Sequence, residues 1–184
     1  LSLMASARVN DQVVGVRTQA LDSAVWENSM WISAVDAPVV TGKITGKNKL
    51  AADGCNWFVA DVRNNQKVVS AVWMTAGLGV YDLYVNGKLV GEEVLKPGFT
   101  HYAKTKLSFT YDVTDAFNKK KGAQNQLSAQ VTPGWWADMI ITHKREDGMI
   151  GKKCAFRGVL ELTYADGSKE YFGTNLEDWK AGIA

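Results

Sequence analysis

The chain has 184 residues, 46% hydrophobic and 22% charged, which is enough to bury the hydrophobic core of a single domain. Its 21 basic and 19 acidic residues are spread along the sequence and leave a formal net charge of +2, so neither nucleic acid nor an anionic membrane is indicated as a partner. The composition is ordinary for a globular protein except for its seven tryptophans, which need an explanation.

Residues 1–56 mix strand-like and loop-like stretches. Residues 12–20, QVVGVRTQA, are compatible with a strand, while residues 41–54, TGKITGKNKLAADG, are rich in Gly, Lys and Asn and indicate a loop. Residues 23–34 contain two of the tryptophans, which we expect to plug one end of the fold. We therefore expect residues 1–56 to wrap, as strands and loops, the core built by residues 57–184, with one compact domain overall.

The opening residues lack the features of a targeting segment. LSLMASARV has no basic region ahead of a long apolar run, so no signal peptide is predicted. No window of the sequence approaches the ~20 apolar residues of a membrane-spanning helix.

From residue 68 onward, short strands alternate with turn signals. Residues 68–75, VVSAVWMT, are apolar on both faces, as expected of a strand buried inside a sheet. The next segment places Tyr81, Leu83 and Val85 on one face and continues into Asn86-Gly87, a dipeptide typical of a tight hairpin turn. A hairpin is therefore predicted at residues 80–90.

The chain then turns and resumes as strands. We expect Pro97-Gly98 to turn it between the sheets, with Phe99 and Tyr102 packed in the corner. Residues 107–113 alternate apolar and polar side chains, which predicts a strand with one solvated face. Thr114 is expected to cap a single helical turn before the period of two returns at 126–131.

A second hairpin is predicted in residues 158–173, GVLELTYADGSKEYFG. Leu160, Leu162 and Tyr164 share a face, and Asp166-Gly167 forms the turn. A two-residue turn there would place Tyr171 opposite Leu162. No segment shows a sustained helical period, so the sequence predicts an all-β domain made of two antiparallel sheets packed face to face.

The sequence shows no recognisable catalytic constellation. It contains no legible pair of carboxylates across a cleft, no nucleophile with a base and no glycine-rich loop entering a helix. Glu92 and Glu93 are adjacent in an extended segment and should point to opposite faces, which favours two solvated side chains. We therefore predict no catalytic residues.

Metal sites and a disulfide remain open alternatives. His101 and His143 are isolated, and Cys55 and Cys154 are far apart in sequence, so either two buried thiols or a disulfide fits the pattern. An oxygen-rich early segment is chemically suited to calcium, although ordinary turn chemistry explains the same side chains. Its residues are Asp53, Asn56, Asp61, Asn64 and Asn65. The favoured prediction is no metal and no cofactor, with calcium as the alternative.

The candidate binding residues lie in TPGWWAD, residues 132–138. Pro133 and Gly134 end the preceding strand and present two tryptophans where a strand gives way to a loop, the usual place for a binding surface in a β-sandwich. An indole can stack on the apolar face of a sugar while short polar side chains bind its hydroxyls. The predicted carbohydrate-binding residues are Thr132, Trp135, Trp136 and Asp138. Alternatively, either indole caps the core.

Several collinear motifs resemble one known family. The run TAGLGVYDLYVNGKLVGEEVLKPGFTHYAKTKLSFTYDVTDAF, the WW pair, LELTYADGS and TNLEDWKA are similar to the N-terminal accessory β-sandwich domain of bacterial α-L-rhamnosidases, over roughly residues 57–180. The sequence departs from the family pattern where Asp138 replaces a common Gly and Thr132-Pro133 replaces Gly-Asp.

The resemblance implies a jelly-roll β-sandwich of the galactose-binding-like type, carried by a longer enzyme next to an (α/α)6 barrel that holds the catalytic acids. It implies a non-catalytic accessory domain that binds carbohydrate or positions substrate during the degradation of rhamnosides or polysaccharides. The alternative is a structural domain that packs against the barrel without a ligand of its own. The implied partners are a glycan containing L-rhamnose and the catalytic domain of the parent enzyme, with a periplasmic or extracellular location.

Overall fold

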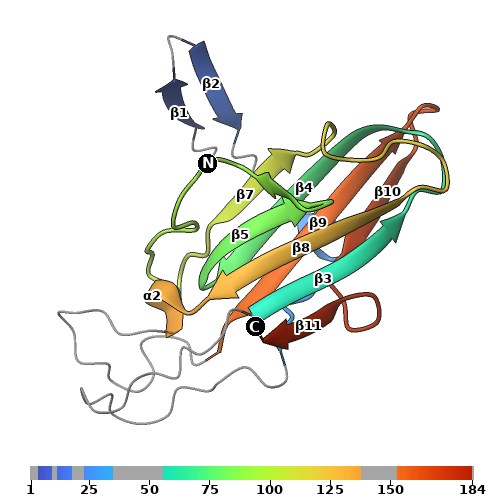
Figure 1. Cartoon of the computed structure of the whole chain (residues 1–184). Coiled ribbons are helices and arrows are strands. Elements are labelled where there is room, and N and C mark those ends of the chain that lie inside the picture. The colour runs from blue at the N-terminus through green and yellow to red at the C-terminus, as the bar shows by residue number, and fades with distance from the viewer. Residues whose placement is uncertain (1–3, 10–11, 18–22, 35–55, 138–152, 184) are drawn as a thin grey trace, which may run out of the picture.

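The computed structural model describes residues 4–9, 12–17, 23–34, 56–137 and 153–183. Within these ranges the chain is almost entirely β, with two antiparallel sheets packed against each other (Figure 1). The helices found in the described part of the chain are the four-residue α1 (Ser23–Trp26) and α2 (Gly134–Ala137). The predicted all-β class and the two antiparallel sheets are thus confirmed. No helix among the described residues has the length and apolarity that a bilayer crossing requires.

The larger sheet has five strands in the order β11-β3-β8-β5-β6. Their bounds are Asn56–Arg63 for β3, Val80–Val85 for β5, Lys88–Val90 for β6, Gln124–Thr132 for β8 and Lys180–Ile183 for β11. Strand β8 pairs with β3 on one side and with β5 on the other. It therefore fixes the spacing between the side chains that those two strands present.

The smaller sheet has four strands in the order β10-β9-β4-β7. Their bounds are Val68–Leu78 for β4, Ser108–Asp112 for β7, Ala155–Tyr164 for β9 and Lys169–Gly173 for β10. A separate antiparallel pair is formed by β1 (Met4–Val9) and β2 (Gln12–Arg17). Strand β4 lies between β9 and β7, as its two apolar faces predict.

The first predicted hairpin joins β5 to β6 through Asn86-Gly87. Both residues have positive φ, 51° and 76°, which is the backbone of a tight two-residue turn. The preceding side chains Tyr81, Leu83 and Val85 are all buried on one face. The predicted turn and the predicted core face are both confirmed.

The second hairpin joins β9 to β10 with a different register from the one predicted. Glu170, not Tyr171, lies opposite Leu162. The loop holds one extra residue: the Gly167 amide donates to the Tyr164 carbonyl, and the Tyr164 amide donates to Ser168. Since side chains alternate along a strand, this single residue turns Tyr171 to the outer face.

The helical turn expected at Thr114 is also wrong. Residues 114–117 form a hydrogen-bonded turn, not a helix. The Thr114 hydroxyl accepts from the Ala71 amide at 2.9 Å, so it ties the loop after β7 to strand β4 instead of capping a helix. The Thr114 hydroxyl, a local signal for a helix cap, is thus used by Ala71, a hydrogen-bond partner 43 residues away in the sequence.

Residues 29–34 lie beside β9. Ile32 and Phe156 exchange backbone hydrogen bonds of 2.9 Å in both directions. The Arg157 guanidinium donates to the Ser29 hydroxyl and carbonyl, each at 2.9 Å, and lies over the Trp26 ring. These contacts fasten part of the N-terminal segment to the smaller sheet.

Aromatic rings join the two sheets in the core. Phe156 of β9 stacks on Phe58 of β3 at 6.0 Å between ring centroids. The edges of Trp73 and Tyr81 and the tilted ring of Trp179 surround the same ring at 5.7 to 6.2 Å. Four of these five side chains are at most 1% exposed, and Trp179 is also buried.

Asparagine side chains hold together the loops at the turn between β5 and β6. The Asn125 carboxamide accepts from the Asn86 side chain and from the Asn118 amide, and donates to Asn64 at 3.1 Å. Asn64 in turn donates to the carbonyls of Asn118 and Lys120. Because Asn64 and Asn125 are each 1% exposed, water cannot replace these bonds at little cost.

Replacement of Asn125 by alanine should destabilise the fold. The change leaves the buried Asn64 oxygen and the Asn118 amide without this partner, which should lower the free energy of unfolding by about 2 kcal/mol. Urea denaturation followed by tryptophan fluorescence measures the effect. Gln126→Ala, at an exposed position next to Asn125, is the control and should change stability by less than about 0.5 kcal/mol. Equal midpoints for the two variants would contradict the structural role of the network.

Candidate functional site

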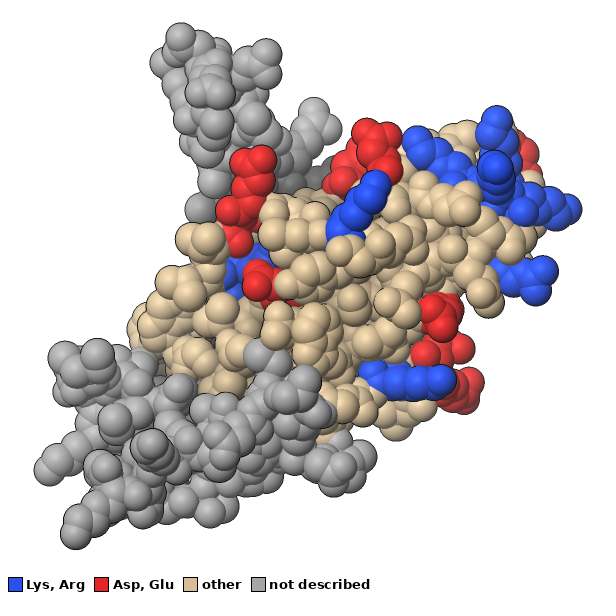
Figure 2. All heavy atoms as spheres, in the orientation of Figure 1, with Lys and Arg blue, Asp and Glu red and all other residues tan. Residues whose placement is uncertain are grey.

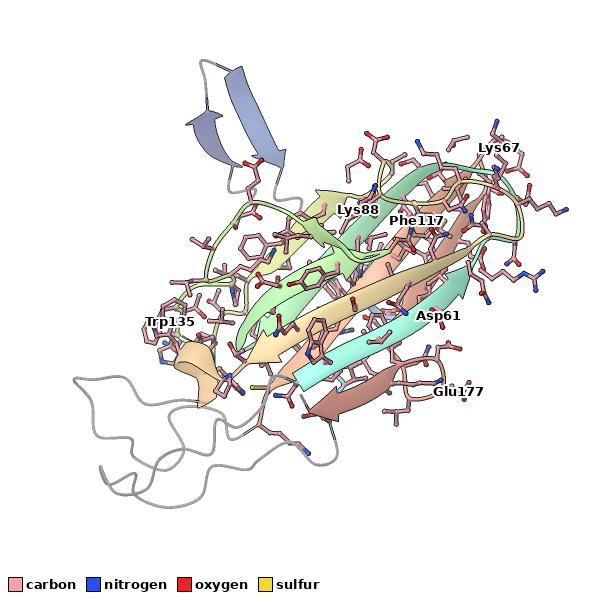
Figure 3. All side chains as sticks on the ribbon, viewed as in Figure 1. Asp61, Lys67, Lys88, Phe117, Trp135 and Glu177 are labelled. Atoms are coloured by element: carbon pink, nitrogen blue, oxygen red, sulfur yellow. The ribbon has the colours of Figure 1, made fainter. Side chains whose placement is uncertain are left out.

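The predicted TPGWWAD site lies at one end of the sandwich, where β8 runs into α2. Gly134 has a φ of 47°, and a Cβ there would come within 2.4 Å of Val80, so the turn needs a glycine. Figure 3 shows Trp135 on α2, at this end of the molecule and far from Glu177.

Trp136 is tied into the protein. Its indole N–H donates to the Lys153 carbonyl at 2.8 Å, and its ring meets Tyr102 edge-on at 5.2 Å between centroids. The ring is partly buried and packs against the hydrophobic core. Trp136 thus closes the end of the sandwich, which agrees with the capping alternative for this residue.

The other three predicted binding residues, Trp135, Thr132 and Asp138, differ in their surroundings. Trp135 is partly exposed, like Trp136. Unlike Trp136, it is not among the residues that pack against the hydrophobic core. The Thr132 hydroxyl donates to the Val80 carbonyl at 3.2 Å, which connects β8 to β5. Asp138 lies outside the described residues. Of the four candidates, Trp135 is the one that the structure leaves best placed to meet a ligand.

The corner after Pro97-Gly98 contributes a further aromatic ring to this end. Tyr102 is buried, burial raises its pKa, and its hydroxyl donates to the Gly98 carbonyl at 3.2 Å. Phe99 meets the Tyr102 ring edge-on at 5.9 Å yet is 62% exposed. Packing of Tyr102 in the corner is confirmed, whereas Phe99 contacts it only with a ring edge and stays mostly exposed, so the predicted packing holds for Phe99 only in part.

A buried lysine supports the loop that carries Phe99. Lys96 is 3% exposed, and its ammonium donates to the Val90 carbonyl at 3.1 Å and lies 5.0 Å from the centre of the Tyr111 ring. Burial lowers the pKa of Lys96, against the opposing influence of Glu93 and Asp82. Sequence reasoning missed this residue, since a lysine in a turn is ordinarily solvated.

Glu93 agrees only in part with the prediction that Glu92 and Glu93 are both solvated. Its residue is exposed, but its carboxylate accepts from the Tyr111 hydroxyl at 3.1 Å. Burial raises the pKa of Tyr111, and the neighbouring Tyr81 and Glu93 add to the shift. Glu93 therefore braces the same loop as Lys96.

Three of the residues considered for calcium instead use their side chains in hydrogen bonds within the protein. Asn64 is buried in the asparagine network, the Asn56 amide donates to the Val131 carbonyl, and Asn65 donates to Glu170. Asp61 is exposed on β3, and Asp53 lies outside the described residues. Within the described ranges, no three His, Cys, Asp or Glu side chains gather closely enough to hold a metal ion.

The remaining candidates for metal or disulfide chemistry are only partly described. His101 is exposed, and Cys154 is buried beside the Ser33 hydroxyl, which donates to its carbonyl. Their counterparts His143 and Cys55 lie outside the described residues.

Comparison with known proteins points to one family. Residues 66–182 match the family model described as the alpha-L-rhamnosidase N-terminal domain. An α-L-rhamnosidase of Alteromonas sp. (strain LOR) is 34% identical over 170 residues, which cover 92% of this chain and 17% of that protein.

Two solved structures have the same fold over a similar region. The α-L-rhamnosidase of Aspergillus terreus superimposes with a TM-score of 0.76 at 25% identity, over 94% of this chain and 18% of the other. The α-L-rhamnosidase of Streptomyces avermitilis, solved in complex with L-rhamnose, gives a TM-score of 0.62 at 34% identity, over 70% of this chain and 12% of the other. The chain thus spans less than a fifth of the length of each relative.

The two adjacent tryptophans should differ in their effect on stability. Trp136→Ala removes the hydrogen bond to Lys153 and the contact with Tyr102, and should lower the free energy of unfolding by about 2 kcal/mol or more. Trp135→Ala removes a ring with fewer core contacts and should cost less than about 1 kcal/mol. Urea midpoints measure both. Equal losses would show that Trp135 is as much a part of the core as Trp136.

Proposed function

Because the chain belongs to the family of α-L-rhamnosidase N-terminal domains, we propose that it serves a longer α-L-rhamnosidase as a non-catalytic accessory domain. Its task is to hold a glycan containing L-rhamnose near the catalytic domain during rhamnoside or polysaccharide degradation. Its partners are that glycan and the catalytic domain itself. Its place of action is the periplasm or the extracellular space, as part of the parent enzyme.

The observation that carries the sugar-binding role is the pair of aromatic rings offered at the α2 end. Phe99 is mostly exposed and Trp135 partly so, and the structure holds the surrounding loops firmly through Trp136, Tyr102 and Lys96. Rings of this kind stack on the apolar faces of sugars. The Streptomyces avermitilis relative, solved in complex with L-rhamnose, supports the choice of sugar.

A second role, packing against the catalytic domain, is favoured by the loop between β6 and β7. Val94 is 85% exposed, Leu95 is 59% exposed, and Phe99 follows in the same loop. Three exposed large apolar side chains within six residues are typical of a surface that meets another part of a protein. This loop is therefore the part of the described surface best suited to contact the parent enzyme.

Titration with L-rhamnose tests the sugar-binding role. A single small ring buries little area, so the dissociation constant should be on the order of 0.1 to 1 mM. Isothermal titration calorimetry should detect rhamnose binding with this dissociation constant for the wild type, with and without calcium. Trp135→Ala should raise the dissociation constant about tenfold. Leu176→Ala, at an exposed apolar position beside Glu177, should leave the heat unchanged. If the wild type gives no heat at millimolar rhamnose, the packing role replaces the sugar-binding role.

The isolated chain should not hydrolyse rhamnosides. Glycoside hydrolysis needs two carboxyl groups flanking the scissile bond, and the accessory role assigns these groups to another domain of the parent enzyme. The test is the release of chromophore from an aryl α-L-rhamnoside at several protein concentrations. Turnover that exceeds a buffer control and scales with the amount of repurified protein would overturn the non-catalytic assignment.

A further inference from the structure

The outward face of strand β3 is unusual because half of it is apolar. Trp57 and Val59 point outward, whereas Asp61 and Arg63 continue the same face with charged side chains. The outward face of an antiparallel sandwich is normally polar along its whole length. In Figure 3, Asp61 lies toward the end of β3 that is remote from α2, so the apolar half is the half nearer α2.

Two aromatic rings meet over the strand that separates them. Trp57 on β3 lies opposite Gln130 of β8, and Tyr84 on β5 lies opposite Ser128 of β8. The ring centroids are nevertheless 5.8 Å apart with an interplanar angle of 35°, so both rings lean inward across β8. Ser128, which lies between them, is only 7% exposed. The rings thus form one surface that crosses three strands, about 10 Å.

Among the residues that the structure describes, no side chain covers either edge of this surface. Gly182 of β11 lies opposite Trp57 and contributes no side chain, and a Cβ at that position would meet no atom within 4 Å. On the other edge, Leu89 of β6 lies opposite Tyr84 and is 60% exposed. A ligand longer than one sugar ring can therefore extend past the aromatic pair in either direction.

The chemistry of the surface suits a neutral ligand that carries hydroxyl groups. Val59, Ser128 and Gln130 supply uncharged neighbours to the two rings, and Asp82 lies opposite Gln130 at the edge. Figure 2 shows a mostly uncharged surface over β3, β8 and β5, with Lys, Arg, Asp and Glu gathered at its margins. Lys180 of β11 lies opposite Val59 at the margin of this surface, so the described residues offer a cation at its edge but not between the two rings. An amide and a carboxylate are good partners for sugar hydroxyls.

We propose that this aromatic surface, made of Trp57, Tyr84, Gln130 and Leu89, binds an extended neutral glycan across the strands of the larger sheet. The proposal rests on the accessory role above for the class of ligand, and it assigns a second, extended site to the face of the sheet, separate from the α2 end.

Solution NMR on the whole 184-residue chain tests the proposal directly. The probe is a neutral rhamnan oligosaccharide, and polygalacturonic acid is the anionic comparison. The indole N–H resonance of Trp57, assigned by its loss in Trp57→Phe, should shift on titration with the oligosaccharide and not with the polyanion. Calorimetry should show about tenfold weaker binding for Trp57→Ala and for Tyr84→Ala.

Two control variants separate this surface from other sites. Tyr171→Ala removes a tyrosine from the outer face of the smaller sheet and should bind the oligosaccharide as the wild type does. Trp135→Ala removes the ring at the α2 end, which should weaken rhamnose binding there, but it should leave the Trp57 shift caused by the oligosaccharide unchanged. If Trp57→Ala does not fold by circular dichroism, the wild-type NMR shift and Tyr84→Ala decide the question.

Four outcomes would overturn the proposal. The first is the absence of a Trp57 shift with the oligosaccharide, and the second is unchanged binding in both folded variants of the aromatic pair. The third is a loss of binding in Trp135→Ala alone, which refutes the sheet-face site while the proposed function survives at the α2 end. The fourth is a Trp57 shift caused by the parent catalytic domain and not by the glycan, which makes the surface a domain contact.

Discussion

The structure depends on the aromatic contact between the two sheets, with Phe156 at its centre. Its ring touches Phe58 and Tyr81 from the larger sheet and Trp73 from its own sheet, while Trp179 covers one side. The five aromatic side chains of this cluster are all buried, and large buried rings of this kind contribute strongly to the hydrophobic stabilisation of a core. Because each strand alternates its side chains, this cluster also decides which residues every neighbouring strand turns outward.

The seven tryptophans divide between the core and the surface. Two are buried in the core, and the other five are partly exposed. The buried ones are Trp73 and Trp179, and the partly exposed ones are Trp26, Trp31, Trp57, Trp135 and Trp136. Some of the latter have structural partners, such as Arg157 for Trp26 and the Lys153 carbonyl for Trp136. The unusual composition therefore serves both the core and the surface, and the tryptophans of the two proposed glycan sites belong to the surface group.

The packing role and the proposed glycan site on the larger sheet use different parts of the molecule and are physically compatible. Firm loops around Lys96 present Val94, Leu95 and Phe99 at one end, where another domain can pack. The face of the larger sheet remains available to a glycan across Trp57 and Tyr84. An accessory domain that holds its enzyme at one end and a polysaccharide on one face would raise the local concentration of substrate without any catalytic residue of its own.

The sequence by itself determined the features that arise between near neighbours. Alternation of side chains and the φ preferences of Asn86-Gly87 act over a few residues, so the all-β class, the first hairpin and its core face were predictable from local sterics. Tertiary structure alone decided whatever depends on distant partners. One additional loop residue changed the β9–β10 register. Lys96 is buried against Tyr81 and Tyr111 and supports its loop from inside. Strand β8 lies between β3 and β5, so the rings of Trp57 and Tyr84 meet across it. Strand order is set by the summed burial of whole sheets, and no pattern within one strand reveals which strand will lie beside it.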